Sequence, residues 1–274
     1  MYKWTEDSLL KFHPDKCGAM RIGTAGNTRT YTMGPEKHNI KAIAEEKDIG
    51  VIIDDKLSFS KHMAAKIKKA NSVMGVIRRT YVHLDEDSFK LLYKGLVRPH
   101  LEYANQVWAP HLQKDITAIE NVQRRATKQI PGLKNATYQD RLRKLNLPTL
   151  KYRRVRGDMI EVYKILTGKY DEEVTMDFMK TKHGDTRGHK YKLYKQHCRL
   201  NIRKFSFTFR VVNMWNSLPE SIVNAKTVKS FEGRLDKWWK DVEWKYDVDA
   251  EITNRPSSRR TQYTEELTPE AEQA

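Results

Sequence analysis

Residues 149–168, TLKYRRVRGDMIEVYKILTG, carry the clearest fold signal of the chain. Their apolar side chains recur at alternating intervals of three and four residues, which places them on one stripe of an α-helix. The stripe consists of Tyr152, Val155, Met159, Val162 and Leu166. Thr149 precedes the stripe as an N-cap, and Gly168 follows it as a C-cap. The stretch therefore predicts a capped helix with one side on a core.

The first turns of this helix are crowded with cations. They are Lys151, Arg153, Arg154 and Arg156. Positive charge at a helix N-terminus opposes the helix dipole, so another group must favour these residues. A phosphate is a candidate for that group.

A second helix is predicted from about Ser58 onward. Its apolar stripe consists of Met63, Ile67, Ala70, Met74 and Ile77. Lys61, Lys68 and Arg79 fall nearly opposite the stripe. Between Lys56 and Leu84 the sequence has seven Lys and Arg and no Asp or Glu. This pattern predicts a helix that docks by one face and presents a basic face.

Further helices are predicted between these two. One begins at the N-cap Asp85, runs through Phe89, Leu92 and Leu96, and ends at Pro99. The next covers residues 113–130 and presents Arg124 and Lys128 one turn apart, away from its apolar side. That apolar side consists of Ile119, Val122, Ala126 and Ile130.

Thr137 and Asp140 resemble a capping box before a short helix with Leu142 and Leu145. Residues 205–215 fit either a strand or a helix. Thr227 caps a last helix whose apolar face is Val228, Phe231, Leu235 and Trp238.

The N-terminal part carries the strand signals. A short helix is expected around Leu9, Leu10 and Phe12, and a hairpin around residues 29–33. Residues 49–53 read as a buried strand before a turn. The fold class is therefore α+β and mostly helical. We expect a partial sheet domain at 1–57, helical regions at 58–133 and 134–246, and a disordered tail at 247–274.

Charge points to a polyanionic partner. The 274 residues contain 51 Lys and Arg against 35 Asp and Glu, which gives a net charge of +16 and a pI near 9.6. Nucleic acid is the usual partner of such a chain. A mean hydropathy of −0.76 and the lack of a long apolar run argue against a membrane. Cys17 and Cys198 are too few for a disulfide framework, so an intracellular protein, nuclear or cytoplasmic, is expected.

A series of short motifs follows the same order and spacing as in one known family. The motifs are Leu91-Leu-Tyr-Lys, Leu96-Val-Arg-Pro-His-Leu-Glu-Tyr-Ala, Val107-Trp-Ala-Pro, Ile119-Glu-Asn-Val-Gln-Arg-Arg-Ala-Thr-Lys, Leu147-Pro-Thr-Leu-Lys-Tyr-Arg-Arg and Arg156-Gly-Asp-Met-Ile. Together they resemble the stretch after the catalytic core in reverse transcriptases of LINE-type (non-LTR) retrotransposons. The resemblance covers roughly residues 4 to 240.

The resemblance implies the end of the palm, the thumb and a connection region of such an RNA-directed DNA polymerase. It implies that Gly50 and Val51 lie in a primer-grip hairpin, and that Lys16 corresponds to the motif D lysine. The two-metal carboxylates of the family, which bind Mg²⁺, lie before the segment that resembles residues 12–17. We therefore expect a fragment that is inactive as a polymerase and has no cofactor of its own. In this chain Lys16 is then either vestigial or a solvated surface residue.

Asp54 and Asp55 follow the strand and superficially resemble a polymerase metal site. Adjacent side chains of a strand point to opposite faces, so a turn role is the expectation for this pair. Tyr191 and Tyr194 lie among cations in a basic connection over residues 180–204, as base-stacking residues or as core anchors. Trp108 and Trp215 are expected to be packing residues. The spacing of His183, His189, His197 and Cys198 fits no zinc pattern.

We expect nonspecific binding of RNA, DNA or their hybrid by the thumb-like helices. The candidate contact residues are Lys61, Lys66, Lys68, Lys69, Arg79, Arg124, Lys128, Arg153 and Arg154. The alternative for each is a merely solvated basic side chain. At the level of the whole chain, the alternatives are a non-enzymatic basic RNA- or DNA-binding or interaction protein, or a decayed reading frame.

Overall fold

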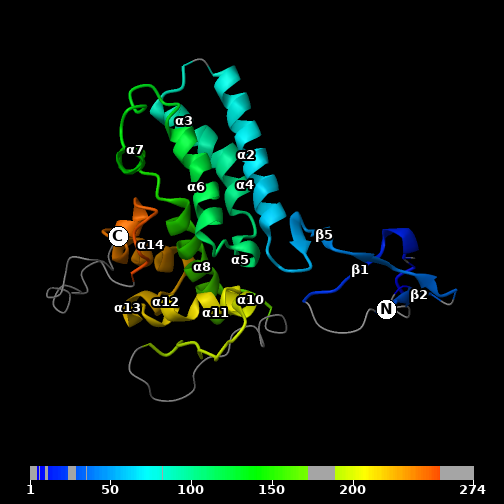
Figure 1. The fold of residues 1–274 in the computed structure, drawn as a ribbon. Helices are drawn as coiled ribbons and strands as arrows, with labels where there is room; N and C mark the ends of the chain where they lie inside the picture. The colour runs from blue at the N-terminus through cyan, green and yellow to red at the C-terminus, as the bar shows by residue number, and fades with distance from the viewer. Residues whose placement is uncertain are drawn as a thin grey trace. The chain divides into compact units, whose positions relative to one another are not determined.

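The computed structural model describes residues 5, 7–9, 12–23, 29–34, 36–81, 83–171 and 189–253. They belong to two compact units, Met1–Lys69 and Ala70–Ala274. Helix α2 (Ser60–Thr80) crosses this boundary, which lies later than the expected one at residue 57. The fold is α+β and mostly helical, with short strands, as the sequence predicts (Figure 1).

In its described part, the first unit contains three two-stranded sheets. Strand β1 pairs in parallel with β4, whereas β2–β3 and β5–β6 are antiparallel. The bounds are η1 Pro14–Lys16, β1 Gly18–Met20, β2 Thr32–Met33, β3 His38–Asn39, β4 Lys41–Ile43, β5 Glu45–Asp48 and β6 Val51–Asp54. The hairpin expected around residues 29–33 is formed by β2 and β3, and the Lys37 N–H donates to the Gly34 carbonyl at 3.0 Å between the two strands.

The β5–β6 hairpin corrects one strand prediction. Ile49 was expected in the buried strand, but it is 80% exposed, with a φ of 42°. Gly50 has a φ of 80°. A two-residue hairpin turn with both φ values positive suits the right-handed twist of the strands, so the strand itself begins only at Val51.

The second unit is helical in its described part. Its elements are α3 Glu86–Leu92, the π-helical turn η2 Tyr93–Val97, α4 Arg98–Glu102, α5 Asn105–Trp108, α6 Gln113–Thr127, α7 Tyr138–Leu145, α8 Leu150–Leu166, α10 Asn201–Lys204, α11 Phe207–Arg210, α12 Val212–Asn216, α13 Glu220–Val223, α14 Val228–Trp238 and the 3-10 turn η3 Glu243–Lys245. Residues 205–215, which fitted strand or helix, are therefore mainly helical.

The helix after Asp85 does not end at Pro99, as the sequence had suggested. The wide turn η2 intervenes, and Pro99 lies in the first turn of α4, where its missing N–H costs little. The buried side of the run is spaced by four residues: Phe89, Tyr93, Val97 and Leu101. Leu96, which was expected on this side, is 51% exposed.

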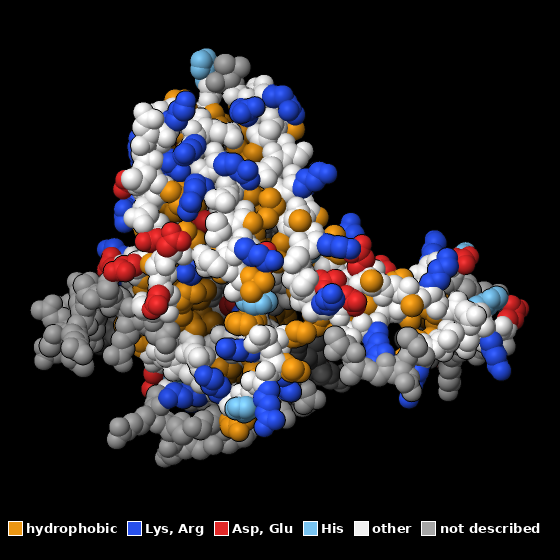
Figure 2. All heavy atoms as spheres, in the orientation of Figure 1, with side chains coloured by type: hydrophobic (Ala, Val, Ile, Leu, Met, Phe, Trp, Pro, Cys, Tyr) orange, Lys and Arg blue, Asp and Glu red, His pale blue; other side chains and the backbone are white. Residues whose placement is uncertain are grey.

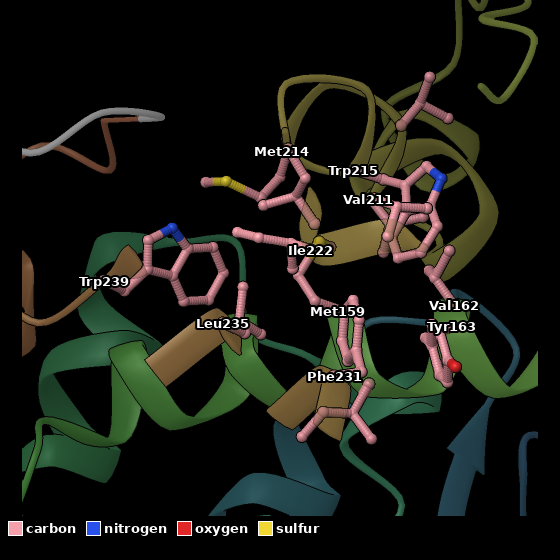
Figure 3. Packing of buried hydrophobic residues seen from close by; sticks show 14 of the residues in the cluster. Met159, Val162, Tyr163, Val211, Met214, Trp215, Ile222, Phe231, Leu235 and Trp239 are labelled. Atoms are coloured by element: carbon pink, nitrogen blue, oxygen red, sulfur yellow. The ribbon is translucent and has the colours of Figure 1, made fainter. Parts of the chain in front are cut away.

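The core of the second unit surrounds α8. Met159, Val162 and Tyr163 of α8 pack against side chains of α12, α13 and α14 (Figure 3). Tyr163 stacks on Phe231 with a centroid distance of 4.4 Å. Trp215 is fully buried, which confirms its expected packing role.

The C-terminal boundary also differs from the expectation. Val248 is buried, and Lys151 Nζ donates to the backbone oxygens of Val248 and Ala250. Residues 247–250 therefore belong to the folded unit rather than to a tail. The tail from residue 254, residues 180–188 of the basic connection, and most of the expected helix around Leu10 lie outside the described residues.

Candidate nucleic-acid interface

Two segments without acidic residues meet in the second unit. Residues 70–84 and 121–139 contain no Asp or Glu. Arg125 on α6 donates from Nη2 to Asn71 Oδ1 on α2, at 3.3 Å. Arg78 follows Asn71 by seven residues and so lies on the same stripe of α2. The hydrogen bond therefore places the middle of α2 beside the last turn of α6.

The cations of these segments form a surface that we name the α2–α6 surface. It consists of Arg78, Arg79, Arg125, Lys128 and Lys134, all of which are exposed. In the described part of the chain, no carboxylate lies within ion-pair distance of these five residues. Figure 2 shows mostly Lys and Arg side chains over the part of the molecule where α2 and α6 lie. No ion pair with a described carboxylate therefore neutralises these five cations.

Arg141 fixes the end of α6 that carries part of this surface. Its Nε donates to Thr127 Oγ1 at 3.0 Å, its Nη1 to Ala136 O at 2.6 Å and its Nη2 to Arg124 O at 3.3 Å. The last carbonyls of a helix lack partners within the helix, so the buried guanidinium, which binds the carbonyl of Arg124, satisfies one of them and complements the helix dipole. Arg141 thereby holds the turn that presents Lys128.

Arg124 is only partly available to a ligand. It is half-buried, and its guanidinium lies over the ring of Tyr138, 4.9 Å from the centroid. Together with Lys128, Arg141, Asp247 and Asp249 it lines a hollow of about 530 Å³. Among the predicted contact residues on α6, Lys128 is thus the more accessible.

Buried hydrogen bonds join α6 to the neighbouring segments. Tyr138 donates to Glu120 Oε1 at 2.6 Å, and the Leu150 N–H donates to Glu120 Oε2 at 3.0 Å. Burial raises the pKa of Glu120, while these hydrogen bonds and Arg154 oppose the rise. Gln123 accepts from the hydroxyl of Tyr93 at 2.7 Å. The Ile119-Glu-Asn-Val-Gln motif thus contributes interior hydrogen bonds rather than surface chemistry.

The cations at the start of α8 have partners inside the protein. Arg153 makes two hydrogen bonds to Glu102, one of them from Nη2 to Oε2 at 2.9 Å. Arg156 binds Asp236 through Nε at 2.6 Å and Nη2 at 2.8 Å. These carboxylates, and the carbonyls bound by Lys151, offset the unfavourable helix dipole. A bound phosphate is therefore not needed to explain why cations occupy the first turns of α8.

Arg154 is 7% exposed, and burial lowers its pKa while Glu120, Glu102 and Asp158 raise it. A guanidinium in this position does not face an external phosphate backbone. The α2–α6 surface therefore includes neither Arg153 nor Arg154, although both were predicted contact residues.

In the first unit, the hairpin with Gly50 and Val51 is attached to α2. The Ile52 N–H donates to Nδ1 of the buried His62 at 3.1 Å. Burial lowers the pKa of His62 to about 4, and Lys66 contributes to this lowering. Lys61, a predicted contact residue, is exposed and pairs with Glu45, which raises its pKa.

Asp54 has the turn role that was expected for it. Its carboxylate accepts hydrogen bonds from the N–H groups of Lys56, Ser58 and Phe59, at 3.1, 3.1 and 2.8 Å. Burial raises its pKa, but the backbone hydrogen bonds outweigh burial and hold the pKa below its usual value. The carboxylate thus organises the turn that leads into α2.

The remaining predicted residues of the first unit are on its surface. Lys68 and Lys69 are exposed on α2, and Lys66 is half-exposed. Lys16 is exposed at the end of η1. Among the described residues, no group of three or more His, Cys, Asp and Glu is arranged to hold a metal. No helix in the described part of the chain is long and apolar enough to cross a membrane.

Sequence reasoning did not select Arg78, Arg125 and Lys134, which belong to the α2–α6 surface. The absence of acids from residues 121–139 was a usable signal for Arg125 and Lys134. Arg78 was harder to select, because its position next to α6 depends on the hydrogen bond between Asn71 and Arg125, 54 residues apart in the chain.

Comparison with known proteins assigns no family. No family model matches the chain, and no solved structure matches it. It is 28% identical over 130 residues to "Uncharacterized protein B0403.1" of Caenorhabditis elegans. The match covers 45% of this chain and 64% of the relative, so the chain spans less than two thirds of that protein. The name of the relative states no activity.

Proposed function

We propose that this chain binds nucleic-acid duplex, without sequence preference, through the α2–α6 surface. The observation that carries the proposal is the Arg125–Asn71 hydrogen bond, which joins two segments free of acidic residues. Exposed Lys and Arg side chains displace counterions from phosphates, and this contribution supplies most nonspecific affinity. Contacts to phosphate position a protein on the duplex without reading its sequence.

The motifs that resemble non-LTR reverse transcriptases support a template–primer hybrid of RNA and DNA as the duplex. A thumb-like helical unit that slides along its substrate requires sequence-independent contacts, which the α2–α6 surface offers. The proposal does not extend to polymerisation by the described residues. Asp54, the acidic residue that superficially resembled a metal ligand, is held by backbone hydrogen bonds in a turn.

Fluorescence anisotropy with a labelled 16-base-pair RNA–DNA hybrid tests the proposal. The apparent affinity should be micromolar at low salt and should fall steeply between about 50 and 200 mM salt. The triple variant Arg78→Gln, Arg125→Gln and Lys128→Gln removes three cations of the surface. The slope of log K against log salt should become shallower by about 0.9 for each phosphate that the variant no longer neutralises, or roughly 2.7 in all.

The matched control is Lys229→Gln, Lys237→Gln and Lys240→Gln, which removes the same charge from exposed positions on and after α14. The control should keep a slope close to that of the unchanged protein. If both triple variants lower the slope equally, only net charge matters and the assigned surface is wrong. If the unchanged protein fails to bind at low salt, the proposed function itself is wrong.

A further inference from the structure

A second basic stretch lies outside the α2–α6 surface. Residues 189–205 contain six Lys and Arg and no Asp or Glu. Residues 194–200 form no helix or strand, and α10 follows. In Figure 1 this yellow-green trace runs beneath α10, α11 and α12. Figure 2 shows Lys, Arg and His side chains on this lower part of the molecule.

The start of the stretch is attached to α12 by hydrogen bonds. The side chain of Asn216 makes two hydrogen bonds to the backbone of Leu193, accepting from its N–H at 2.8 Å and donating to its carbonyl at 2.9 Å. Trp215 Nε1 donates to the carbonyl of Tyr191 at 2.8 Å. His189 is buried, and its Nε2 lies 3.2 Å from the carbonyl of Trp215. Residues 189, 191 and 193 are thus each hydrogen-bonded to α12.

The side chains of this segment differ in exposure. His189 and Leu193 are buried and Tyr191 packs on the core, whereas Lys190 and Tyr194 are exposed. Of the two tyrosines proposed for stacking, Tyr191 is therefore a core anchor. Tyr194 is 55% exposed, although an aromatic ring gains by burial.

Cations precede and follow Tyr194 in the sequence of the stretch. The exposed ones are Lys190, Lys195, Arg199, Arg203 and Lys204. An exposed aromatic ring within a basic strip is the combination that binds unpaired bases, because the ring stacks on a base while the cations follow the phosphates. A base inside a duplex is already stacked on its neighbours, so this arrangement favours a single strand.

We propose that residues 189–205 bind single-stranded nucleic acid, with Tyr194 stacked on an unpaired base and Lys190, Lys195 and Arg199 close to the backbone. This site is distinct from the α2–α6 surface and does not depend on duplex binding. Hydrogen bonds to α12 already order residues 189–193, next to Tyr194, which lowers the entropic cost of binding.

Anisotropy with a labelled 12-nucleotide oligo(U), at constant salt, tests the site. Tyr194→Ala should weaken binding about tenfold, within the range for losing one stacked base. Tyr194→Phe keeps the ring and should stay within about twofold of the unchanged protein. Tyr170→Ala, at another exposed tyrosine, is the control and should leave the affinity unchanged. Both positions are on the surface, so the variants should fold.

Equal affinities for Tyr194→Ala and the unchanged protein would overturn the proposal. Equal losses for Tyr194→Ala and Tyr194→Phe would also overturn it, because the hydroxyl rather than stacking would then matter. Displacement of oligo(U) by polyglutamate as readily as by unlabelled oligo(U) would show a general anion surface instead. The variant with Arg78, Arg125 and Lys128 replaced by Gln should retain the Tyr194 effect, which separates this site from the duplex surface.

Discussion

Replacing Arg210 with Met is expected to destabilise the second unit by about 3–5 kcal/mol, the usual cost of removing one partner of a buried ion pair. Arg210 donates from Nε to Asp158 Oδ2 and from Nη2 to Oδ1, both at 2.9 Å. Its Nη1 also donates to the Gln106 carbonyl at 3.2 Å. The side chain of Asp158 is only 8% exposed, so without Arg210 its charge has little access to water. The loss is therefore larger than for a surface pair.

The pH dependence of this loss has a definite sign. Burial raises the pKa of Asp158, and Arg210 is the main group that opposes the rise. Without Arg210 the folded-state pKa rises further above the unfolded value of about 3.9. A raised pKa disfavours the ionised form in the folded state, so the penalty is complete above the folded pKa and is relieved as pH falls below it. The difference between Arg210→Met and the unchanged protein should thus be smaller at pH 5 than at pH 8.

Urea unfolding followed by tryptophan fluorescence measures this effect, because Trp215, Trp239 and Trp244 are buried in the same unit. A double-mutant cycle adds two more proteins: the single variant Asp158→Leu, and the double variant that combines Asp158→Leu with Arg210→Met. The double variant should be more stable than Arg210→Met alone, since it also removes the carboxylate that Arg210→Met leaves without its guanidinium partner. A loss below about 1 kcal/mol for Arg210→Met, or simple additivity of the two single variants, would refute the reasoning.

Two further predictions concern single side chains. His62 has its pKa lowered by burial to about 4, below the ordinary 6.5, so its contribution to stability is complete above pH 6.5 and is lost as pH falls toward 4. In an NMR titration its ring signals should shift near pH 4, and a midpoint near 6.5 would contradict the burial of the ring. Arg141→Lys should destabilise the second unit by roughly 2–4 kcal/mol, because a single ammonium cannot replace the three hydrogen bonds of the guanidinium. Arg143→Lys, at an exposed neighbour, is its control and should change unfolding by less than about 0.5 kcal/mol.

Local signals predicted the helices well. The caps Asp85, Thr137, Thr149 and Thr227 each accept a backbone hydrogen bond at the start of a helix, as expected. A cap and an apolar stripe depend on residues within a few turns, so one sequence suffices to identify them. The π turn before Pro99 was not predictable in this way, because helical periodicity assumes a constant number of residues per turn.

The candidate site was predicted less completely, for a physical reason. A basic residue in the sequence has the same charge whether it faces solvent or a carboxylate. The partners that distinguish these cases are distant: Arg153 binds Glu102, 51 residues away, and Arg156 binds Asp236, 80 residues away. The expected phosphate role of Arg153 rested on helix polarity alone, which could not identify a partner from another helix.

The structure nevertheless separates the cations by chemistry. Arg141, Arg153, Arg156 and Arg210 make several directed hydrogen bonds each, to carbonyls or carboxylates of other segments. A planar guanidinium suits that task, whereas an ammonium on a flexible stem acts as a point charge. Lys128, Lys134, Lys190 and Lys195 are exposed, where a point charge can follow a phosphate backbone without a fixed geometry. Arginines of the family-like motifs, such as Arg153 and Arg156, can therefore preserve the fold through partners inside the protein, while the exposed Lys and Arg side chains are the ones that we propose to contact phosphates.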